Sequence, residues 1–181
     1  MCGRYYFDFE EAYHKLSKMD IDCSKLSFDI SKEEIFPTQN VLVLLKEKDK
    51  IIPAIKKWGI LGYQGNLLIN ARNETIKEKP TFSKLLDQRC IIIASGFYEW
   101  KKQGTKKAKI YIKKENAPIL YMAGIYNEKN EFVIITVQSK GDMARVHERS
   151  PLLLDERAMK HYLFHESYAI DESKLLFTLM P

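Results

Sequence analysis

The segment VLVLLKEKDKIIPAIKK, residues 41–57, predicts the basic unit of the fold. Two apolar, β-branched runs, 41–46 and 51–57, flank the charged turn at 47–50, which is the pattern of a β-hairpin. Further runs of this kind follow at 67–70, 90–95, 98–102, 109–113, 119–125 and 132–137. Short links at 103–105 and 127–130 join neighbouring runs. The chain is therefore expected to consist mainly of antiparallel strands.

Helical patterns are fewer. Asp8 and Glu11 form a capping-box-like start to a helix that reaches Met19. A second helix is expected from Thr81, directly after a proline, and a third from Asp155. Because strands outnumber helices, we expect an α+β fold, in which a largely antiparallel, partly closed β-sheet or barrel is flanked by a few helices.

Length and composition favour one ordinary globular domain over residues 1–181. Hydrophobic residues make up 45% of the chain, and no repeat or linker divides it. Neither an apolar run of about 18 residues nor a signal peptide is present, which predicts a cytoplasmic protein with no membrane partner. We also expect a monomer. The net charge of +5 permits an acidic partner such as nucleic acid but does not require one.

Cys2 is the most unusual chemical feature of the sequence. Initiator methionine is removed when the next residue is small, so the mature chain is expected to begin with a free α-amine beside a thiol. The amine has an ordinary pKa of about 7.7 to 8.0 and the thiol about 8.5. An aldehyde attacked by the amine gives a Schiff base, which the thiol can close into a thiazolidine. Position alone, however, favours an incidental residue in a frayed terminus.

Four other polar residues accompany apolar strands. Asn70 and Arg72 stand where a short strand ends, and Glu99 lies among aromatic residues, which raise a carboxyl pKa and suit proton transfer. His147 lies between two arginines. Taken singly, each has a simpler interpretation: Arg72 as an ion-pair partner, Glu99 as a surface charge and His147 as a solvated turn residue.

Together, five motifs in the same order resemble the SOS response-associated peptidase (SRAP) family, whose members shield abasic sites in single-stranded DNA. The resemblance runs from Met1 to about Leu154. The motifs are Met1-Cys2-Gly3-Arg4-Tyr5, Trp58-Gly59, Asn70-Ala71-Arg72-x-Glu74-Thr75, Gly96-x-x-Glu99-Trp100 and His147-x-Arg149-x-Pro151.

The resemblance implies a catalytic set. Cys2 would form the thiazolidine with the ring-opened abasic sugar, and Asn70 would hold its amine and the product ring by hydrogen bonds. Glu99 would exchange protons with the amine and the sugar hydroxyl. His147 would assist sugar ring opening and Schiff-base chemistry.

The resemblance also implies a partner, single-stranded DNA that contains abasic sites, and a set of DNA-binding residues. The protein would be associated with the nucleoid when it is bound to DNA. Phosphates beside the lesion would be held by Arg4, Arg72 and Arg149, with a hydrogen bond from Thr136. Pro37 would act as a wedge and Trp58 as a stacking face for displaced bases.

Three departures affect the base-stacking wall. The asparagine that usually precedes the equivalent of Pro37 is missing from the segment 34–37. A second tryptophan after Trp58 is also missing, with Tyr63 the nearest aromatic residue, and Ser150 stands where methionine is common.

Other functions and sites are less well supported. Cys2, Glu99 and His147 could imitate a thiol peptidase site, including one that removes Met1, and a non-covalent reader of modified DNA is a further alternative. His161 and His165 have the spacing of a zinc pair but lack a third ligand, so no metal and no cofactor is expected. The lysines of residues 101–114 fit a protected sheet edge better than a DNA contact.

Overall fold

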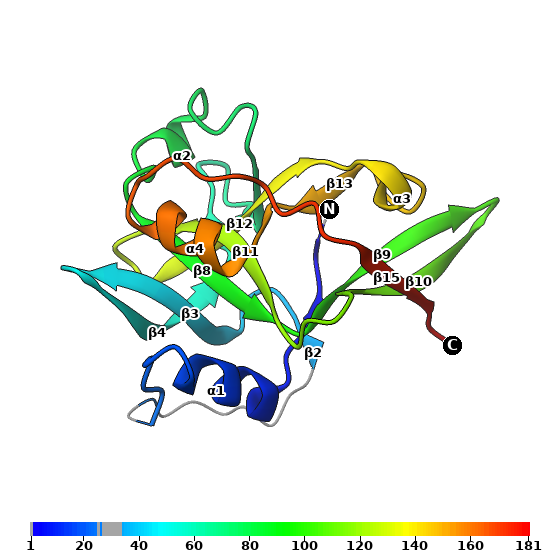
Figure 1. The fold of residues 1–181 in the computed structure, drawn as a ribbon. Coiled ribbons are helices and arrows are strands. Elements are labelled where there is room, and N and C mark those ends of the chain that lie inside the picture. The colour runs from blue at the N-terminus through cyan, green and yellow to red at the C-terminus, as the bar shows by residue number, and fades with distance from the viewer. Residues whose placement is uncertain (1, 25, 27–33) are drawn as a thin grey trace.

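The computed structural model describes residues 2–24, 26 and 34–181. Figure 1 shows two sheets that meet near the middle of the molecule, with short helices outside them. The larger sheet has the spatial order β13 (Arg149–Pro151), β12 (Glu131–Gln138), β4 (Lys50–Trp58), β3 (Asn40–Glu47), β8 (Arg89–Ala94), β11 (Leu120–Tyr126) and β14 (Leu153–Leu154). Because β12 also pairs with β11, the strands β12, β4, β3, β8 and β11 close into a ring.

The second sheet is continuous with this ring, because β8 of the ring leads directly into a strand of the second sheet. Its spatial order is β15 (Leu175–Leu179), β10 (Lys106–Lys114), β9 (Gly96–Gln103), β1 (Tyr5–Tyr6) and β2 (Glu34–Ile35), with every pair antiparallel. Ser95 alone separates β8 from β9, and its amide donates to the Tyr6 carbonyl at 2.8 Å. A Cβ at Gly96 would collide with the ring of Tyr111. That close approach explains why a glycine begins β9.

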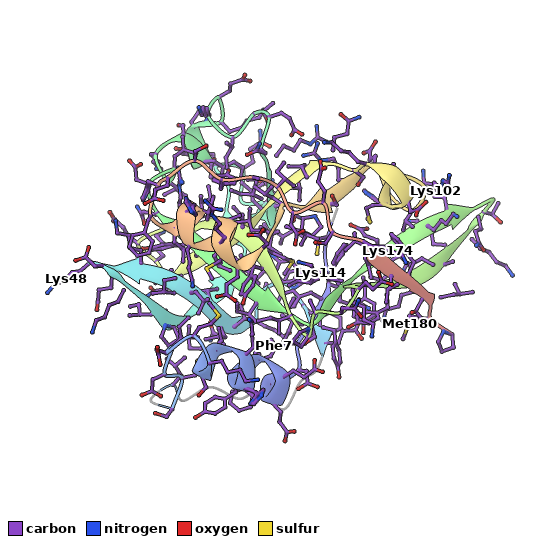
Figure 2. All side chains as sticks on the ribbon, in the orientation of Figure 1. Phe7, Lys48, Lys102, Lys114, Lys174 and Met180 are labelled. Carbon is purple, nitrogen blue, oxygen red and sulfur yellow. The ribbon has the colours of Figure 1, made fainter. Side chains whose placement is uncertain are left out.

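Two hairpins extend to opposite sides of the molecule. Figure 2 shows Lys48 at the tip of the β3–β4 hairpin and Lys102 on the β9–β10 hairpin, far apart in the view. A small sheet of β5 (Ile60–Leu61) and β6 (Leu67–Leu68) precedes β7 (Asn70–Arg72), which pairs in parallel with β12. The parallel pairing of β7 brings residue 70 next to the ring.

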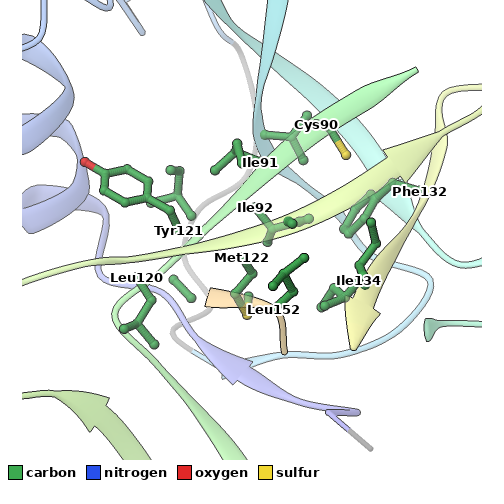
Figure 3. Packing of buried hydrophobic residues seen from close by; sticks show 14 of the residues in the cluster. Cys90, Ile91, Ile92, Leu120, Tyr121, Met122, Phe132, Ile134 and Leu152 are labelled. Atoms are coloured by element: carbon green, nitrogen blue, oxygen red, sulfur yellow. The ribbon is translucent and has the colours of Figure 1, made fainter. Parts of the chain in front are cut away.

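The core fills the ring and the space beneath its covering helix. Figure 3 shows Ile92, Met122, Phe132 and Ile134 packed together, and each of these is fully buried. Strand β8 is buried along nearly its whole length, because its outer face is covered by α4 (Glu156–Leu163). The Tyr162 hydroxyl of α4 donates to the Gly124 carbonyl of β11 at 2.8 Å, which ties the helix to the sheet.

The longer helices have the predicted caps. The Asp8 side chain accepts from the Glu11 amide at 3.1 Å at the start of α1 (Phe9–Ser17), and Asp155 accepts from the Ala158 amide at 2.7 Å at the start of α4. The remaining helices, α2 (Pro80–Ser83) and α3 (Gly141–Ala144), are single turns. The N-cap residue of α2, Lys79, makes no side-chain hydrogen bond to the helix, which helps explain why α2 is short.

The predicted fold class is confirmed: the architecture is a partly closed, largely antiparallel sheet with few helices. The hairpin over residues 41–57 is also confirmed as β3 and β4. Several strands were not predicted: β1, β2, β5, β13 and β14 have only two or three residues, and β15 pairs with β10, which is distant in sequence. None of the helices in residues 2–24, 26 and 34–181 is long and apolar enough to cross a bilayer.

Candidate functional site

The N-terminal run lies along β9. Tyr5 pairs with Phe97, and the Tyr98 amide donates to the Arg4 carbonyl at 2.9 Å. Continuing this antiparallel register toward the N-terminus brings Cys2 to the part of β9 that carries Glu99. The run is dark blue in Figure 1, and the charge of Glu99, one of the predicted catalytic residues, acts on the Cys2 thiol.

Asn70 reaches Cys2 from the other sheet. Its position is fixed by the pairing of β7 with β12 and by a 2.9 Å hydrogen bond from the Trp58 indole to the Ile69 carbonyl. The Asn70 side-chain amide donates to the Cys2 carbonyl at 2.9 Å. Its Oδ1 is buried and accepts no hydrogen bond from the described residues. An acceptor beside Cys2 is therefore available for an N–H donor.

The Cys2 side chain is fully buried, and its thiol lies 3.8 Å from the Arg4 carbonyl. Burial, followed by the negative charge of Glu99, raises the pKa of the thiol to about 12. The thiol is therefore protonated near neutral pH. Met1, whose removal is predicted, lies outside the described residues.

Glu99 and His147 line one cleft of about 570 Å³. Glu99 comes from β9 and is 2% exposed, whereas His147 is half-buried and follows α3. His147 Nδ1 lies 3.0 Å from the Arg149 amide and 3.2 Å from the Arg149 carbonyl, so the backbone of Arg149 orients the imidazole ring. Basic residues extend the cleft along the β9–β10 hairpin and the facing segment: Lys101, Lys102, Lys107 and Arg145.

Arg149 is largely committed to contacts within the protein. Its guanidinium donates to both carboxylate oxygens of Glu74, at 3.0 and 2.9 Å, and to the Thr136 carbonyl at 2.7 Å. These hydrogen bonds, more than any other effect, lower the pKa of Glu74 to about 2. The Arg149 side chain is 10% exposed and Thr136 is fully buried. Arg149 and Thr136 therefore help to join the segment after β7 to β12 and β13, and the phosphate contacts that the resemblance implies for both stay a prediction.

The other two predicted phosphate ligands are more accessible. Arg72 is exposed at the end of β7. The Arg4 guanidinium is partly exposed and donates to Glu34 Oε1 at 3.2 Å. Pro37 is half-buried in the turn after β2, next in sequence to Phe36, on whose ring Arg4 lies.

The family model described as SOS response associated peptidase (SRAP) matches residues 1–180. This chain belongs to the SRAP family. It is 31% identical over 183 residues to the abasic site processing protein YoqW of Bacillus subtilis, with 90% of this chain and 80% of the relative covered. The abasic site processing protein YedK of Escherichia coli is 28% identical, with 97% and 85% covered. HMCES of Xenopus tropicalis is 31% identical, with 59% and 41% covered.

Solved structures share this SRAP chain's fold. A protein from Bacteroides thetaiotaomicron superposes with a TM-score of 0.82 at 19% identity, over 99% of this chain and 92% of the other. A protein from Bordetella bronchiseptica gives a TM-score of 0.78 at 17% identity, over 99% and 100% of the two chains.

One SRAP motif residue has a different environment from the predicted one. Trp58 is fully buried, stacks on Phe132 with ring centroids 6.4 Å apart, and lies 5.4 Å from the Tyr5 ring. Its ring therefore cannot stack on a displaced base in this arrangement, because the core covers it. The aromatic ring exposed beside Arg4 is that of Phe36, which is 40% exposed.

Sequence reasoning also missed residues around this SRAP site. Glu74 was quoted within a motif, but its pairing with Arg149 depends on the register of three strands. Glu34 and Lys109 are joined by an ion pair of 2.8 Å across the second sheet. No local pattern indicates such contacts, since the partners are distant in sequence.

The two histidines of α4 and the following turn do not converge on one site. His161 lies 2.7 Å from a Glu166 oxygen, and His165 lies 3.8 Å from an Asp87 oxygen. Within the part of the chain that the structure describes, no group of three or more His, Cys, Asp or Glu residues is placed to hold a metal ion.

Proposed function

We propose that this SRAP protein processes abasic sites in single-stranded DNA by forming a thiazolidine through the amine and thiol of Cys2. The observation that carries the proposal is the contact of Asn70 with Cys2, beside the buried carboxylate of Glu99. The names of the relatives, abasic site processing proteins, support abasic sites as the substrate.

The chemistry needs no external oxidant or reductant. Removal of Met1 supplies the α-amine, which attacks the aldehyde carbon of the ring-opened sugar. A C=N bond forms and one water leaves. The Cys2 sulfur then adds to that carbon, a C–S bond forms, and the thiol proton ends on nitrogen. The net result is a five-membered ring and the loss of one water.

The state of the thiol supports this order of events. Burial of the side chain and the negative charge of Glu99 both favour the neutral thiol over the thiolate. The amine attacks first, and the imine carbon then accepts sulfur at close range.

The surrounding groups have distinct roles in the proposal. Asn70 Oδ1 accepts from the Cys2 amine while the amide of the same side chain holds the Cys2 carbonyl. Glu99 takes the proton that the amine must lose and returns one to the departing hydroxyl. His147 donates a proton to the sugar oxygen during ring opening. Each transfer is general acid–base catalysis, which requires hydrogen-bond reach.

DNA binding completes the proposal. Arg72, exposed at the end of β7, contacts a phosphate beside the lesion, and Arg4 contacts another. The protein acts as a monomer and is consumed by one lesion, because the product is a stable covalent bond. Its benefit is shielding of the lesion from strand cleavage.

A denaturing gel with abasic single-stranded DNA tests the proposal. We expect a shifted band that survives denaturation, and an intact mass equal to protein without Met1 plus DNA minus one water. Binding that is lost on denaturation would instead indicate a non-covalent reader. Cleavage of a model peptide without a shifted band would favour the peptidase.

A further inference from the structure

One carboxylate oxygen bridges two cations at the edge of the N-terminal run. Glu34 Oε1 lies 3.2 Å from Arg4 Nη1 and 2.8 Å from Lys109 Nζ. The three side chains come from three different strands, β2, β1 and β10. All are partly accessible, with exposed fractions of 30% for Arg4, 26% for Lys109 and 30% for Glu34.

Aromatic rings hold both cations without help from Glu34. The Arg4 guanidinium carbon lies 4.2 Å from the centre of the Phe36 ring and 5.1 Å from that of Trp100. Lys109 Nζ lies 4.2 Å from the centre of the Tyr98 ring. Cation–π contacts of this length orient the charge independently of an anion. The two cations therefore have contacts that do not depend on the carboxylate.

Arg4 also has a donor to spare. Its Nε is buried and has no hydrogen-bond acceptor within the described part of the chain. A guanidinium presents its N–H groups in a rigid fork that matches two oxygens of a phosphate. Glu34 is bonded at Nη1 and leaves Nε unused. The cluster therefore contains more donors than the carboxylate satisfies.

From this geometry we infer that Arg4 and Lys109 form one binding site for a phosphodiester of the nucleic-acid strand, and that Glu34 is an internal anion which the phosphate displaces. Lys109 thereby becomes a DNA-binding residue and Glu34 an intramolecular competitor. The inference deepens the proposed function, on which it rests only for the identity of the ligand as a DNA strand.

Displacement is feasible because partly exposed ion pairs are weak and are screened by salt. A strand that supplies several phosphates can exchange one of them for the carboxylate. Breaking the ion pairs of Glu34 nevertheless costs free energy. The affinity for any DNA strand is therefore lower than it would be in a site without Glu34. Glu34 thus limits the non-covalent retention of undamaged DNA, while an abasic strand is retained by the covalent bond.

Titration of undamaged oligothymidine, followed by fluorescence anisotropy at several salt concentrations, tests the inference. Glu34→Gln removes the charge but keeps the shape, and we expect binding to be about three- to tenfold tighter, because two exposed ion pairs no longer have to be broken. Lys109→Ala is expected to weaken binding and to reduce the salt slope by about 0.7, the value for one phosphate contact on a single strand.

Glu156→Gln is the matched control. Glu156 bridges Lys15 and Lys160, at 2.8 and 3.1 Å, and its substitution makes the same change in net charge outside the cluster. An affinity gain in Glu34→Gln that Glu156→Gln does not share supports the site. Equal gains in both variants, or unchanged affinity in Lys109→Ala, would overturn it.

Crosslinking to abasic DNA separates this inference from the proposed function. If Glu34→Gln binds undamaged strands more tightly while the unmodified protein forms no crosslink, the phosphate site stands and the covalent mechanism falls. If the unmodified protein crosslinks but Glu34→Gln gains no affinity over Glu156→Gln, the covalent mechanism stands and the competitor role of Glu34 is wrong. Thermal melting of each variant verifies that it is folded.

Discussion

The side-chain amide of Asn70 donates a 2.9 Å hydrogen bond to the main-chain carbonyl of Cys2, 68 residues away in sequence. This contact holds the backbone of residue 2 through its carbonyl and does not involve its nitrogen or sulfur. A terminal residue would otherwise be expected to fray. The contact therefore gives a physical reason why a reagent at the very end of a chain can have a defined position.

The first prediction concerns the α-amine. A protein with one extra residue fused ahead of Cys2, and retained there, should form no crosslink, because an acylated nitrogen cannot form a Schiff base. Its affinity for undamaged single strands should be nearly unchanged. A denaturing gel and a binding titration measure the two properties. A fusion that still crosslinks would revive a thiol-only route.

The second prediction separates the two reactive atoms of residue 2. Cys2→Ser, with Met1 removed, keeps the amine but closes the five-membered ring far less favourably. Its Schiff base should form and hydrolyse, so that a lasting band appears only when borohydride is present during the reaction. The unmodified protein should need no reductant. A serine protein that crosslinks stably without borohydride would contradict the thiazolidine.

The third prediction concerns the two proton-transfer groups. Glu99→Gln and His147→Ala should each slow crosslinking by a factor of about 10² to 10⁴, the usual contribution of a positioned acid or base. Glu148→Gln is the control, since Glu148 lines the same cleft but is exposed. Single-turnover rates measure the effect, and melting curves report whether each variant is folded. If both variants crosslink at the rate of the unmodified protein, then Cys2 carries out the reaction without help from Glu99 or His147.

The fourth prediction concerns Arg72, the exposed cation at the end of β7. Arg72→Ala should weaken binding to undamaged single strands and lower the salt slope by about 0.7, since one phosphate contact is lost. Arg157→Ala removes an equally exposed arginine from α4 and should leave the slope unchanged. Equal slopes in the two variants would give Arg72 a structural role.

The fifth prediction concerns the pH dependence of stability. Arg149 holds the pKa of Glu74 at about 2, below the value of about 4.3 for an unfolded chain. The ion pair therefore stabilises the fold fully above pH 4.3 or so and loses this effect as the pH falls toward 2. The exposure of Glu74, 48%, keeps the effect modest.

Urea unfolding of the unmodified protein and of Glu74→Gln at pH 7 and pH 3 measures this effect. The difference in the free energy of unfolding should be larger at pH 7, where the carboxylate is charged in both states. A difference that does not change with pH would show that the charge of Glu74 contributes nothing.

The part of the fold that could be predicted is the part encoded by neighbours in sequence. The β3–β4 hairpin and the caps of α1 and α4 depend on residues a few positions apart. Strand β1 has two residues and exists because β9 and β2 pair with it on either side. No local propensity of so short a segment could have predicted it.

The candidate site divides in the same way. The motifs carrying Cys2, Asn70, Glu99 and His147 were found from sequence, and the structure adds their surroundings. The environment of Trp58 could not be predicted, because a tryptophan suits a stacking surface and a core equally well. The pairing of Arg149 with Glu74 depends on side-chain directions set by strand register.

The single residue between β8 and β9 has a consequence for local unfolding. Ser95 alone separates β9, which carries Glu99, from the deeply buried strand β8 of the ring. Local opening of β9 near Glu99 would therefore disturb the core. The facing segment around α3 is one helical turn followed by residues 145–148, none of which is buried. The two walls of the cleft thus differ in rigidity. In the proposed function, a strand of DNA that entered the cleft would meet a fixed wall on the Glu99 side and an adjustable one on the His147 side.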